Sequence, residues 1–342
     1  MRILYGIQST GKGHLSRFLG LRPHFREDGH KLCVIASGYE TPPDYFLEAI
    51  SDYEYHRFKG ISYVGNGQGG VSETRTTAAF LKNFPRLMDE IAKAHRLVRD
   101  FQPDVIVSDF EPITACPVVA PDIPKIGLSH QSAVLSPGVH HPPGLPFAKL
   151  STRTVVSIFT AGLNHKFGSH FYPANHYCLP PIIRPAILNA KRENRGHIIA
   201  YYTMPGLLPE IKNYALTHSD RQFIIYGAKG EKDSANIHYE QDRSQFAQDL
   251  ASCDTYVGTA GFQSISEAFF LGKKIVVKPL AGQYEQIWNA AQLEHYGMGR
   301  WMRQSLVEAL EQDFNSELHT KLKNWFENGS RTCYEKILAA AH

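Results

Sequence analysis

Gly11-Lys12-Gly13-His14, near the start of the chain, combines two glycines with an ionisable side chain directly after an apolar segment. That segment, Arg2–Gly6, has the pattern of a buried strand, so the glycines form a turn at its carboxyl end. Glycine has no Cβ, and the backbone of such a turn can approach a ligand closely. A histidine at this edge can act as a general base. We therefore expect Gly11, Lys12 and Gly13 to form a loop that presents His14 to a ligand.

The same stretch nearly matches a nucleotide-binding P-loop, which needs Ser or Thr after its Gly-Lys pair to hold magnesium. Gly6, Gly11 and Lys12 fit that spacing, but the next residue is Gly13, which has no hydroxyl group. A segment similar to a Walker B strand, Asp104–Asp109, occurs later in the chain. An ATPase therefore remains an open alternative.

Asp109 is a second ionisable group expected at this edge. The segment Pro103–Pro112 has the pattern of a buried strand that ends in Ser108-Asp109. The carboxyl ends of parallel strands meet at one edge of a sheet, so Asp109 is expected near His14. A carboxylate there can orient and charge-stabilise a histidine base. The alternative is that Asp109 caps the following helix.

The stretch Tyr256–Gly299 carries an ordered set of groups that suit a nucleotide sugar. A strand ends at Gly258-Thr259, Gly261 turns the chain, and a helix follows. The N-terminus of such a helix binds phosphate through its free N–H groups and its dipole. Acid and amide side chains beyond it suit ribose and sugar hydroxyls, although each can also be a capping residue. The polar residues concerned are Ser264, Ser266, Glu267, Glu285, Gln286 and Asn289.

This stretch resembles the donor-binding signature of GT-B glycosyltransferases. It is similar to that of the enzymes that add N-acetylglucosamine to the lipid-linked peptidoglycan precursor, and to that of the UDP-glycosyltransferases. The resemblance implies that the turn at Gly261 and Ser264 carries the diphosphate and that Glu267 holds the ribose. It implies that Glu285, Gln286 and Asn289 contact the donor sugar. The loop ending in His14 resembles that of the same families, whose histidine lies beside the reaction centre. The whole pattern resembles an uncharacterised bacterial and archaeal branch.

Two departures from the family pattern concern the donor side. Thr259-Ala260-Gly261 stands where plant enzymes have His-Cys-Gly, and Tyr201–Glu210 lacks a Gly-Gly-Ser found in some relatives. We expect Thr203, with Gly206, to take over the role of the missing Gly-Gly-Ser. His238 and Tyr239, before the helix at Gln245, are candidates for contacts with the base, although packing against the neighbouring helix is the preferred interpretation for either one. Arg184 is interpreted either as a phosphate ligand or, preferably, as part of a salt bridge at the hinge.

Alternating strands and helices must position these groups, which predicts parallel α/β sheets. The predicted strands are Arg2–Gly6, Lys31–Ala36, Asp104–Val107, Lys125–Leu128, Ile198–Tyr202, Gln222–Tyr226, Thr255–Val257 and Lys274–Lys278. The predicted helices are Leu15–Glu27, Thr76–Phe101, Pro209–His218, Gln245–Ala251, Ser264–Leu271, Glu285–Tyr296 and a last one over Ser316–Ala340.

The prolines of Leu179–Asn194 interrupt this alternation and mark a domain boundary. We expect a GT-B architecture of two Rossmann-like domains facing a cleft. Residues 1–180 form an acceptor-binding domain, 181–195 a linker and 196–315 a nucleotide-sugar-binding domain. Residues 316–342 form a C-terminal helix that, in the family, crosses back to the first domain.

The composition excludes several classes of protein. The 342 residues carry a formal net charge of +3, too weak a surplus to indicate a nucleic-acid partner. The five cysteines are not spaced as metal ligands, and an odd number of free thiols favours a reducing cytoplasm. No apolar segment approaches the ~18 residues of a membrane span, and the N-terminus lacks the pattern of a signal peptide. We expect a cytoplasmic protein, with a peripheral position on the inner face of the membrane left open.

We therefore interpret the chain as a metal-independent hexosyltransferase without a cofactor. His14, oriented by Asp109, deprotonates an acceptor hydroxyl that displaces the nucleoside diphosphate with inversion at the sugar. The resemblance implies UDP as that diphosphate. The acceptor is a cell-envelope glycan or a lipid-linked glycan, and retention of configuration stays open. A nucleotide-sugar 2-epimerase of the same fold and a non-catalytic nucleotide-sugar-binding protein also fit these residues.

Overall fold

The computed structural model describes residues 1–38, 41–60, 73–201, 207–228, 230–311 and 317–341, without the side chains of residues 73–81. The chain divides into two compact units. The first comprises Met1–Val139, Gly144–Ile182 and Asn328–His342, and the second comprises His140–Pro143 and Ile183–Glu327.

The first unit contains a seven-stranded parallel sheet in the order β3-β2-β1-β4-β5-β6-β7. Its strands are β1 (Arg2–Gln8), β2 (Lys31–Ser37), β3 (Glu54–Phe58), β4 (Val105–Asp109), β5 (Lys125–Ser129), β6 (His165–Ser169) and β7 (Cys178–Leu179). Its helices are α1 (Lys12–Glu27), α2 (Asp44–Ala49), α3 (Glu73–Phe101), the 3₁₀ helix η1 (Gln131–Leu135), α4 (Pro146–Phe159) and α12 (Gly329–Ala340). The chain starts in the middle of the sheet at β1 and winds to both sides, as in doubly wound folds.

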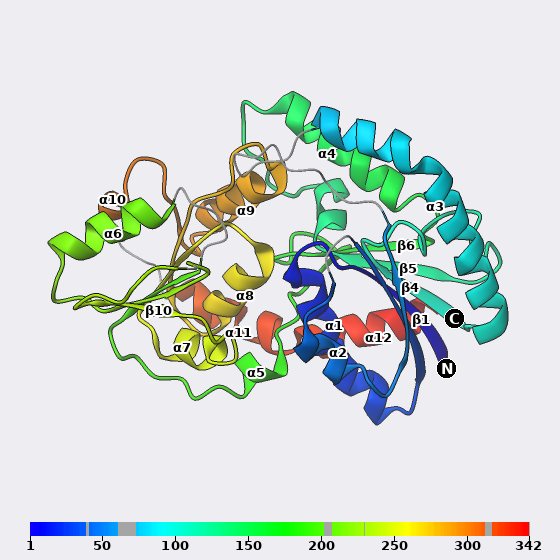
Figure 1. The fold of residues 1–342 in the computed structure, drawn as a ribbon, viewed down its shortest axis with the longest axis horizontal. Helices are drawn as coiled ribbons and strands as arrows, with labels where there is room; N and C mark the ends of the chain where they lie inside the picture. Colours follow the sequence, from blue (N-terminus) through cyan, green and yellow to red (C-terminus); the bar gives the residue numbers. More distant parts are fainter. Residues whose placement is uncertain (39–40, 61–72, 202–206, 229, 312–316, 342) are drawn as a thin grey trace. The chain divides into compact units, whose positions relative to one another are not determined.

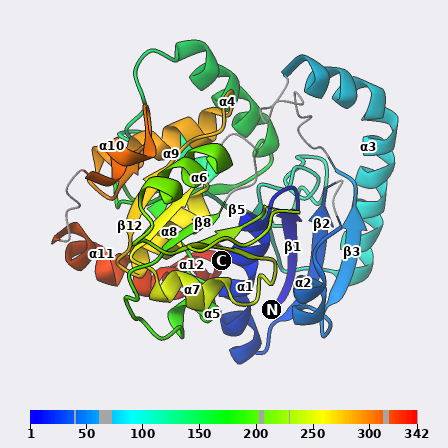
Figure 2. The same ribbon diagram turned by 60° about the vertical axis from the view of Figure 1, so that its left-hand side comes forward.

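Both faces of this sheet are buried at β1, where Ile3, Leu4 and Tyr5 are apolar and fully buried. Ile3 and Tyr5 point to the face covered by α1, α2 and α12. Leu4 points to the opposite face, where it packs with residues of α3 such as Ala94 and Leu97. Figures 1 and 2 show α3 on one side of the strands and α1 and α2 on the other. The sheet therefore holds the start of α1 rigidly beside the ends of β1 and β4.

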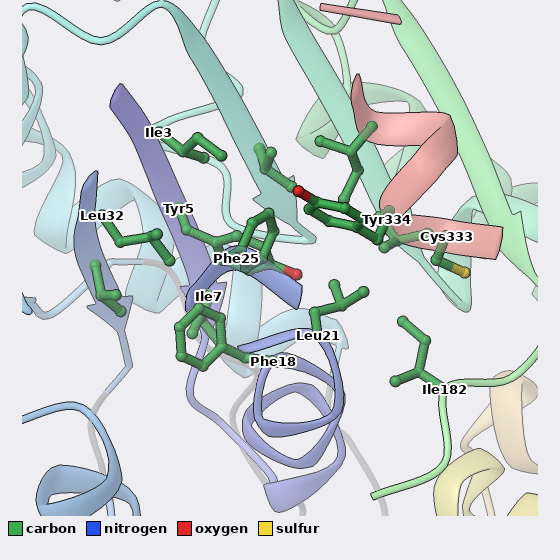
Figure 3. Close-up of a cluster of buried hydrophobic side chains, with 14 of the residues drawn as sticks. Ile3, Tyr5, Ile7, Phe18, Leu21, Phe25, Leu32, Ile182, Cys333 and Tyr334 are labelled. Carbon is green, nitrogen blue, oxygen red and sulfur yellow. The ribbon is translucent and has the colours of Figure 1, made fainter. Parts of the chain in front are cut away.

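An aromatic cluster joins α12 to α1. Figure 3 shows Phe18 and Phe25 of α1 and Tyr334 of α12 gathered beside Tyr5 of β1. The ring of Tyr5 lies 4.9 Å from that of Phe18, and the rings of Phe25 and Tyr334 lie 5.4 Å apart, both pairs edge to face. Edge-to-face packing aligns the electropositive ring edge with the face of its neighbour. The last helix is thus part of the core of the first unit.

The second unit contains a six-stranded parallel sheet in the order β10-β9-β8-β11-β12-β13. Its strands are β8 (Ile198–Tyr201), β9 (Phe223–Tyr226), β10 (Ile237–Glu240), β11 (Thr255–Gly258), β12 (Lys274–Val277) and β13 (Arg300–Trp301). Its helices are α5 (Pro185–Leu188), α6 (Leu208–Thr217), α7 (Phe246–Ser252), α8 (Phe262–Phe270), α9 (Tyr284–His295), α10 (Leu306–Glu311) and α11 (Glu317–Glu327). Its strand order again changes direction beside the first strand, here between β8 and β11.

The eight predicted strands are all present, with their ends shifted by a few residues. The predicted single helix over Ser316–Ala340 is wrong, because α11 ends at Glu327 and α12 begins at Gly329. Gly329 packs so closely on the chain of Pro181 that an added Cβ would lie 1.9 Å from the Pro181 carbonyl oxygen. α12 therefore begins at this close contact with the chain at Pro181.

All five cysteines are free thiols. Within the described part of the chain, no helix is both long enough and apolar enough to cross a membrane.

Candidate active site

The first group of candidate residues lies where β1 and β4 run side by side. The two strands pair in parallel, with Ile7 opposite Asp109, so both end at the same edge of the sheet. The chain turns at Gly11, whose φ of 89° favours glycine, and enters α1 at Lys12. This edge, where the strand order reverses, is where doubly wound sheets bind ligands.

His14 occupies the third position of α1 and is 8% exposed. Its Nδ1 atom lies 2.7 Å from Oδ1 of Asp109, which is fully buried at the end of β4. A carboxylate only accepts hydrogen bonds, so Nδ1 of His14 carries the proton and donates it. This leaves the Nε2 lone pair as the basic site. The amide nitrogen of Gln131 lies 3.5 Å from Nε2, in agreement with an acceptor at that atom.

Arg17, one helical turn further along α1, completes this group. It is 3% exposed, donates to the same Oδ1 of Asp109, and its Nη1 lies 3.3 Å from Nδ1 of His14. A buried carboxylate without a cation is costly, so the guanidinium compensates the charge of Asp109. His14 therefore faces a carboxylate whose charge is largely neutralised. Arg17 was not among the predicted site residues, although its spacing of three residues from His14 places both on one helix face.

Packing and secondary structure explain the residues that resemble a P-loop. Gly6 lies inside β1, where an added Cβ would come within 2.2 Å of the Thr114 hydroxyl oxygen. Lys12 is exposed at the first position of α1, and Gly13 follows it in the helix. Gly6 is therefore required by packing in the strand, and the turn consists only of Ser9 to Gly11.

The second group lies at the carboxyl end of β11, beside β8. The turn Gly258–Gly261 leads into α8, which begins at Phe262. Gly261 has φ −74° and ψ 131°, a conformation open to any residue, and an added Cβ would meet only the Ser264 hydroxyl at 3.4 Å. Neither backbone nor packing therefore requires glycine at this position.

Two of the serine and amide side chains hold this turn in place. Ser264 donates to the Gly261 carbonyl, and Asn289 of α9 donates to the Ala260 carbonyl at 2.9 Å. Asn289 is fully buried. Ser266 is also fully buried and donates to the carbonyl of Phe262 within α8. The structure thus gives Asn289 and Ser266 internal partners, and Ser264 lies nearest the open start of the helix.

Glu267 forms a bidentate ion pair with Arg184. Its two oxygens accept from Nε and Nη2 of Arg184, both at 2.6 Å, and Gln263 donates to Oε1 at 2.9 Å. The Glu267 side chain is 1% exposed, and that of Arg184 is 25% exposed. The salt bridge expected as the preferred interpretation of Arg184 is therefore present, and its partner is the predicted ribose ligand.

A short segment of the chain supports α9 from one side. The carbonyl of His140 accepts from Nε1 of Trp288 at 2.7 Å and from Nε2 of Gln292 at 3.2 Å. His141 contacts the hydroxyl of Tyr284 through Nδ1 at 3.0 Å. These α9 residues are four positions apart and share one helix face. The segment His140–Pro143 therefore fixes the helix that carries Glu285 and Gln286.

Comparison with known proteins identifies the family of this chain. The family model described as Glycosyl transferase family 1 matches residues 1–318. The chain belongs to glycosyl transferase family 1.

Three relatives of this glycosyltransferase illustrate the likeness. An uncharacterised glycosyltransferase of Methanosarcina mazei is 23% identical over 337 residues, covering 89% of this chain and 86% of its own. The solved glycotransferase of kitacinnamycin is 14% identical, with 99% and 98% of the two chains covered and a TM-score of 0.70. UGT2 of Phytolacca americana, solved with UDP-2-fluoroglucose and pterostilbene, is 12% identical, with 99% and 97% covered and a TM-score of 0.65. These structures confirm the predicted α/β fold of the GT-B class.

The other residues predicted to bind the donor sugar or its phosphates are Glu285, Gln286 and Thr203. Gln286, near the start of α9, accepts from the backbone N–H of Leu280 at 3.0 Å, and the neighbouring Glu285 is half-buried. Thr203 lies outside the described residues. The hydrogen bond from Asn289 of α9 to the Ala260 carbonyl connects α9 to the turn before α8.

The two candidates for contacts with the base lie elsewhere. His238 and Tyr239 are on β10, which is separated from β11 by the strands β9 and β8. Tyr239 is buried in the core beneath α6. His238 is exposed, and its hydrogen bond to Asp233 raises its pKa. The structure therefore gives Tyr239 a packing role and His238 an ion pair, because the strand that carries them forms the outer edge of the sheet.

Proposed function

We propose that this glycosyltransferase transfers a hexose from a nucleoside diphosphate sugar, with uridine as the nucleoside, to an acceptor hydroxyl. The observation that carries the proposal is the orientation of His14. Its Nδ1 atom donates to Asp109, so Nε2 carries the basic lone pair, at the edge of the sheet where doubly wound folds bind ligands. Such a group accepts the proton of an attacking hydroxyl. The uridine assignment is supported by the UDP sugar bound to the relative UGT2.

In the proposed reaction, Nε2 of His14 takes the acceptor proton as the hydroxyl oxygen attacks the anomeric carbon. The bond from that carbon to the diphosphate oxygen breaks, and the nucleoside diphosphate leaves. The configuration inverts, because attack and departure occur on opposite faces of the sugar. Asp109 holds the imidazole orientation and stabilises the imidazolium that forms. Arg17 compensates the charge of the buried Asp109 through its ion pair with that carboxylate.

The start of α8 is the proposed diphosphate site. Its first N–H groups lack partners within the helix, and the helix dipole favours negative charge there. Gly261 leaves the backbone open to a phosphate, which supplies a reason for glycine at a position that packing does not explain. Because these groups stabilise the leaving diphosphate, we propose that transfer needs no metal ion.

Glu267, Glu285, Gln286, Asn289 and Ser264 keep their proposed roles on the donor side, some of them indirect. Asn289 and Ser264 act through the turn that they bond, since both donate to its carbonyls. Glu267 would accept a ribose hydroxyl in addition to the hydrogen bonds that it already accepts from Arg184 and Gln263. Thr203 and His238 remain proposals without a described contact to this turn.

A lipid-linked acceptor of the cell envelope is supported by the outer face of α4. Phe147, Leu150 and Ile158 are 86%, 64% and 66% exposed. The helix carries Lys149 and Arg153 and has no acidic residue. An exposed apolar helix face flanked by cations suits the surface of an anionic membrane. We propose that the enzyme meets its acceptor there as a peripheral protein on the cytoplasmic side.

The function is tested by incubating the purified protein with a panel of UDP-sugars and measuring UDP release. We expect release that depends on an added membrane or glycan extract, and that survives a chelator. Release of free sugar or its epimer without extract would indicate an epimerase. Binding without turnover under every condition would indicate a binding protein. Hydrolysis of ATP that needs magnesium would support an ATPase.

The membrane contact is tested by flotation with neutral and anionic phospholipid vesicles. We expect flotation with anionic vesicles and its loss when Phe147, Leu150 and Ile158 are all changed to Ser. Leu216→Ser is the control, because Leu216 of α6 is exposed to a similar degree, 78%, and lies outside α4. Equal flotation of the triple variant and the wild type would remove this part of the proposal.

A further inference from the structure

Cys33, Glu54 and His56 form a cluster of possible metal ligands at the edge of the first sheet. Cys33 on β2 is paired directly opposite Glu54 on β3. His56 is two residues beyond Glu54, so both side chains point to the same face of the strand. One ligand atom from each residue, the sulfur, an imidazole nitrogen and a carboxylate oxygen, lies within 4.8 Å of the other two.

These three donors match the chemistry of zinc. Zn²⁺ takes Cys sulfur at about 2.3 Å and His nitrogen or carboxylate oxygen at about 2.0–2.2 Å in tetrahedral geometry. Its ligand atoms are then about 3.4–3.6 Å apart, which follows from those bond lengths. The ligand atoms, all within 4.8 Å of one another, are at most about 1 Å farther apart than this spacing. His56 and Glu54 are already oriented toward each other, with Nε2 and Oε1 2.8 Å apart.

The surroundings supply both an anchor and an entry path. Cys33 is fully buried against α3, whereas the side chains of Glu54 and His56 are 48% and 38% exposed. Burial and the charge of Glu54 raise the pKa of the Cys33 thiol to about 12, so the free thiol is protonated at neutral pH. A divalent cation reverses this preference, because it binds the thiolate and displaces the proton.

We propose that Cys33, Glu54 and His56 bind one Zn²⁺ ion, with water as the fourth ligand on the solvent side. Binding releases the thiol proton of Cys33 to solvent and forms three bonds from protein to metal. The ion joins β2 to β3, the end strand of the sheet. Its role is to stabilise this edge, so it is independent of the proposed sugar transfer. The ligands come from two strands, which is why no spacing of cysteines along the chain indicates the site.

The test uses Co²⁺ as a spectroscopic substitute for Zn²⁺ in protein freed of metal by a chelator. We expect one equivalent of Co²⁺ to give a thiolate-to-cobalt charge-transfer band that Zn²⁺ abolishes. Cys33→Ser should lose the band. His56→Ala, which changes an exposed side chain, should keep the fold and weaken Co²⁺ binding by at least about tenfold. Cys116→Ser is the matched control, since Cys116 is a half-buried thiol of the same unit, and it should retain the band.

Stability gives a second readout. A ligand that binds only the folded protein raises its unfolding temperature. Zn²⁺ should therefore raise that temperature in the wild type and in Cys116→Ser, but not in His56→Ala or Glu54→Gln. Absence of the charge-transfer band in the wild type at saturating Co²⁺ would overturn the proposal. An unchanged affinity in His56→Ala would overturn it as well, because the ion would then bind elsewhere.

Discussion

His14 and Arg17 contact the same oxygen atom of Asp109. Both lie on α1, one turn apart, and both are nearly buried. The candidate active site is therefore a group of three ionisable side chains, in which a carboxylate lies between a histidine and a permanent cation. This arrangement makes Arg17 a positioning residue with an electrostatic effect on His14.

Arg17→Met should move the acid limb of the pH dependence of kcat/KM to higher pH. Without the guanidinium, the full charge of Asp109 favours the imidazolium form of His14, and a cation 3.3 Å from Nδ1 is removed. Both changes have the same sign. The measured quantity is the direction of the shift of the acid limb.

Two further variants separate this effect from a loss of structure. Arg17→Lys keeps the charge and should restore the wild-type pH profile even if its stability is lower. Arg22→Met removes an arginine of the same helix whose ion pair with Asp52 is partly exposed, and should leave the profile unchanged. A wild-type profile in a folded Arg17→Met protein would contradict the electrostatic role.

His14→Ala should lower turnover by about 10²–10⁴-fold, the usual contribution of a general base. Donor affinity should persist, since the base acts in the transition state. Lys12→Ala should have a much milder effect, because Lys12 is exposed. Asp109→Asn should be impaired in the same direction as His14→Ala, and the double variant should be little worse than the worse single one. Steady-state kinetics and calorimetry with UDP measure these effects. Near-normal turnover of His14→Ala would remove the base assignment, and lost nucleotide binding in Lys12→Ala would favour a P-loop.

Gly261→Ala should weaken binding of UDP while leaving the unfolding temperature close to that of the wild type. The backbone angles suit alanine, and its Cβ meets only the Ser264 hydroxyl at 3.4 Å. A methyl group there obstructs a phosphate that approaches the first N–H groups of α8. Calorimetry and a thermal unfolding assay measure the two quantities. Unchanged UDP affinity in the variant would show that the diphosphate does not approach this turn.

Much of the fold follows from local pattern, whereas the details of the site do not. β1, β4 and β11 each contain consecutive apolar residues, so their burial between helices could be predicted. The meeting of His14 and Asp109 follows from two parallel strands that end at one edge. The edge strand β3, in contrast, has the sequence EYHRF, whose polar residues hide its strand character.

The partners of buried charges could not be predicted, because they depend on how helices pack. Arg184 and Glu267 are 83 residues apart and meet only in the folded second unit. Asn289 suited a sugar hydroxyl by its chemistry, but the fold directs it to the carbonyl of Ala260. Both Glu267 and Asn289 satisfied the family pattern, and that pattern carries no information on which groups are already paired within the protein.

Lowering the pH should weaken the packing of α12 against the rest of the first unit. Burial and the N-terminal ammonium lower the pKa of His30, and burial and Arg331 lower that of His24. His30 accepts from the ammonium through Nδ1, so its Nε2 donates to the hydroxyl of Tyr334 on α12. A histidine whose pKa is lower in the folded state contributes stability above its usual value of 6.5, and this is lost as the pH falls through the folded value.

Hydrogen exchange of residues 329–340 measures this effect at about pH 7.5 and about pH 5.5, after correction for the intrinsic exchange rates. We expect lower protection at the acid pH, and a smaller difference in His30→Gln, which cannot take up a proton. Protection that is equal at the two pH values, or a His30→Gln protein with the full pH dependence, would contradict the assignment.

Gly329→Ala should destabilise the contact between α12 and the segment at Pro181. Alanine favours a helix over glycine by about 1 kcal/mol, which alone would stabilise α12. Its Cβ, however, would lie 1.9 Å from the Pro181 carbonyl oxygen, a backbone atom that cannot move without the chain around it. Overpacking of this kind costs about 1–3 kcal/mol or more, so we expect a net loss and a lower unfolding temperature. Lys336→Ala, on the exposed side of the same helix, should leave that temperature unchanged. A Gly329→Ala protein more stable than the wild type would show that α12 does not pack on Pro181 at this distance.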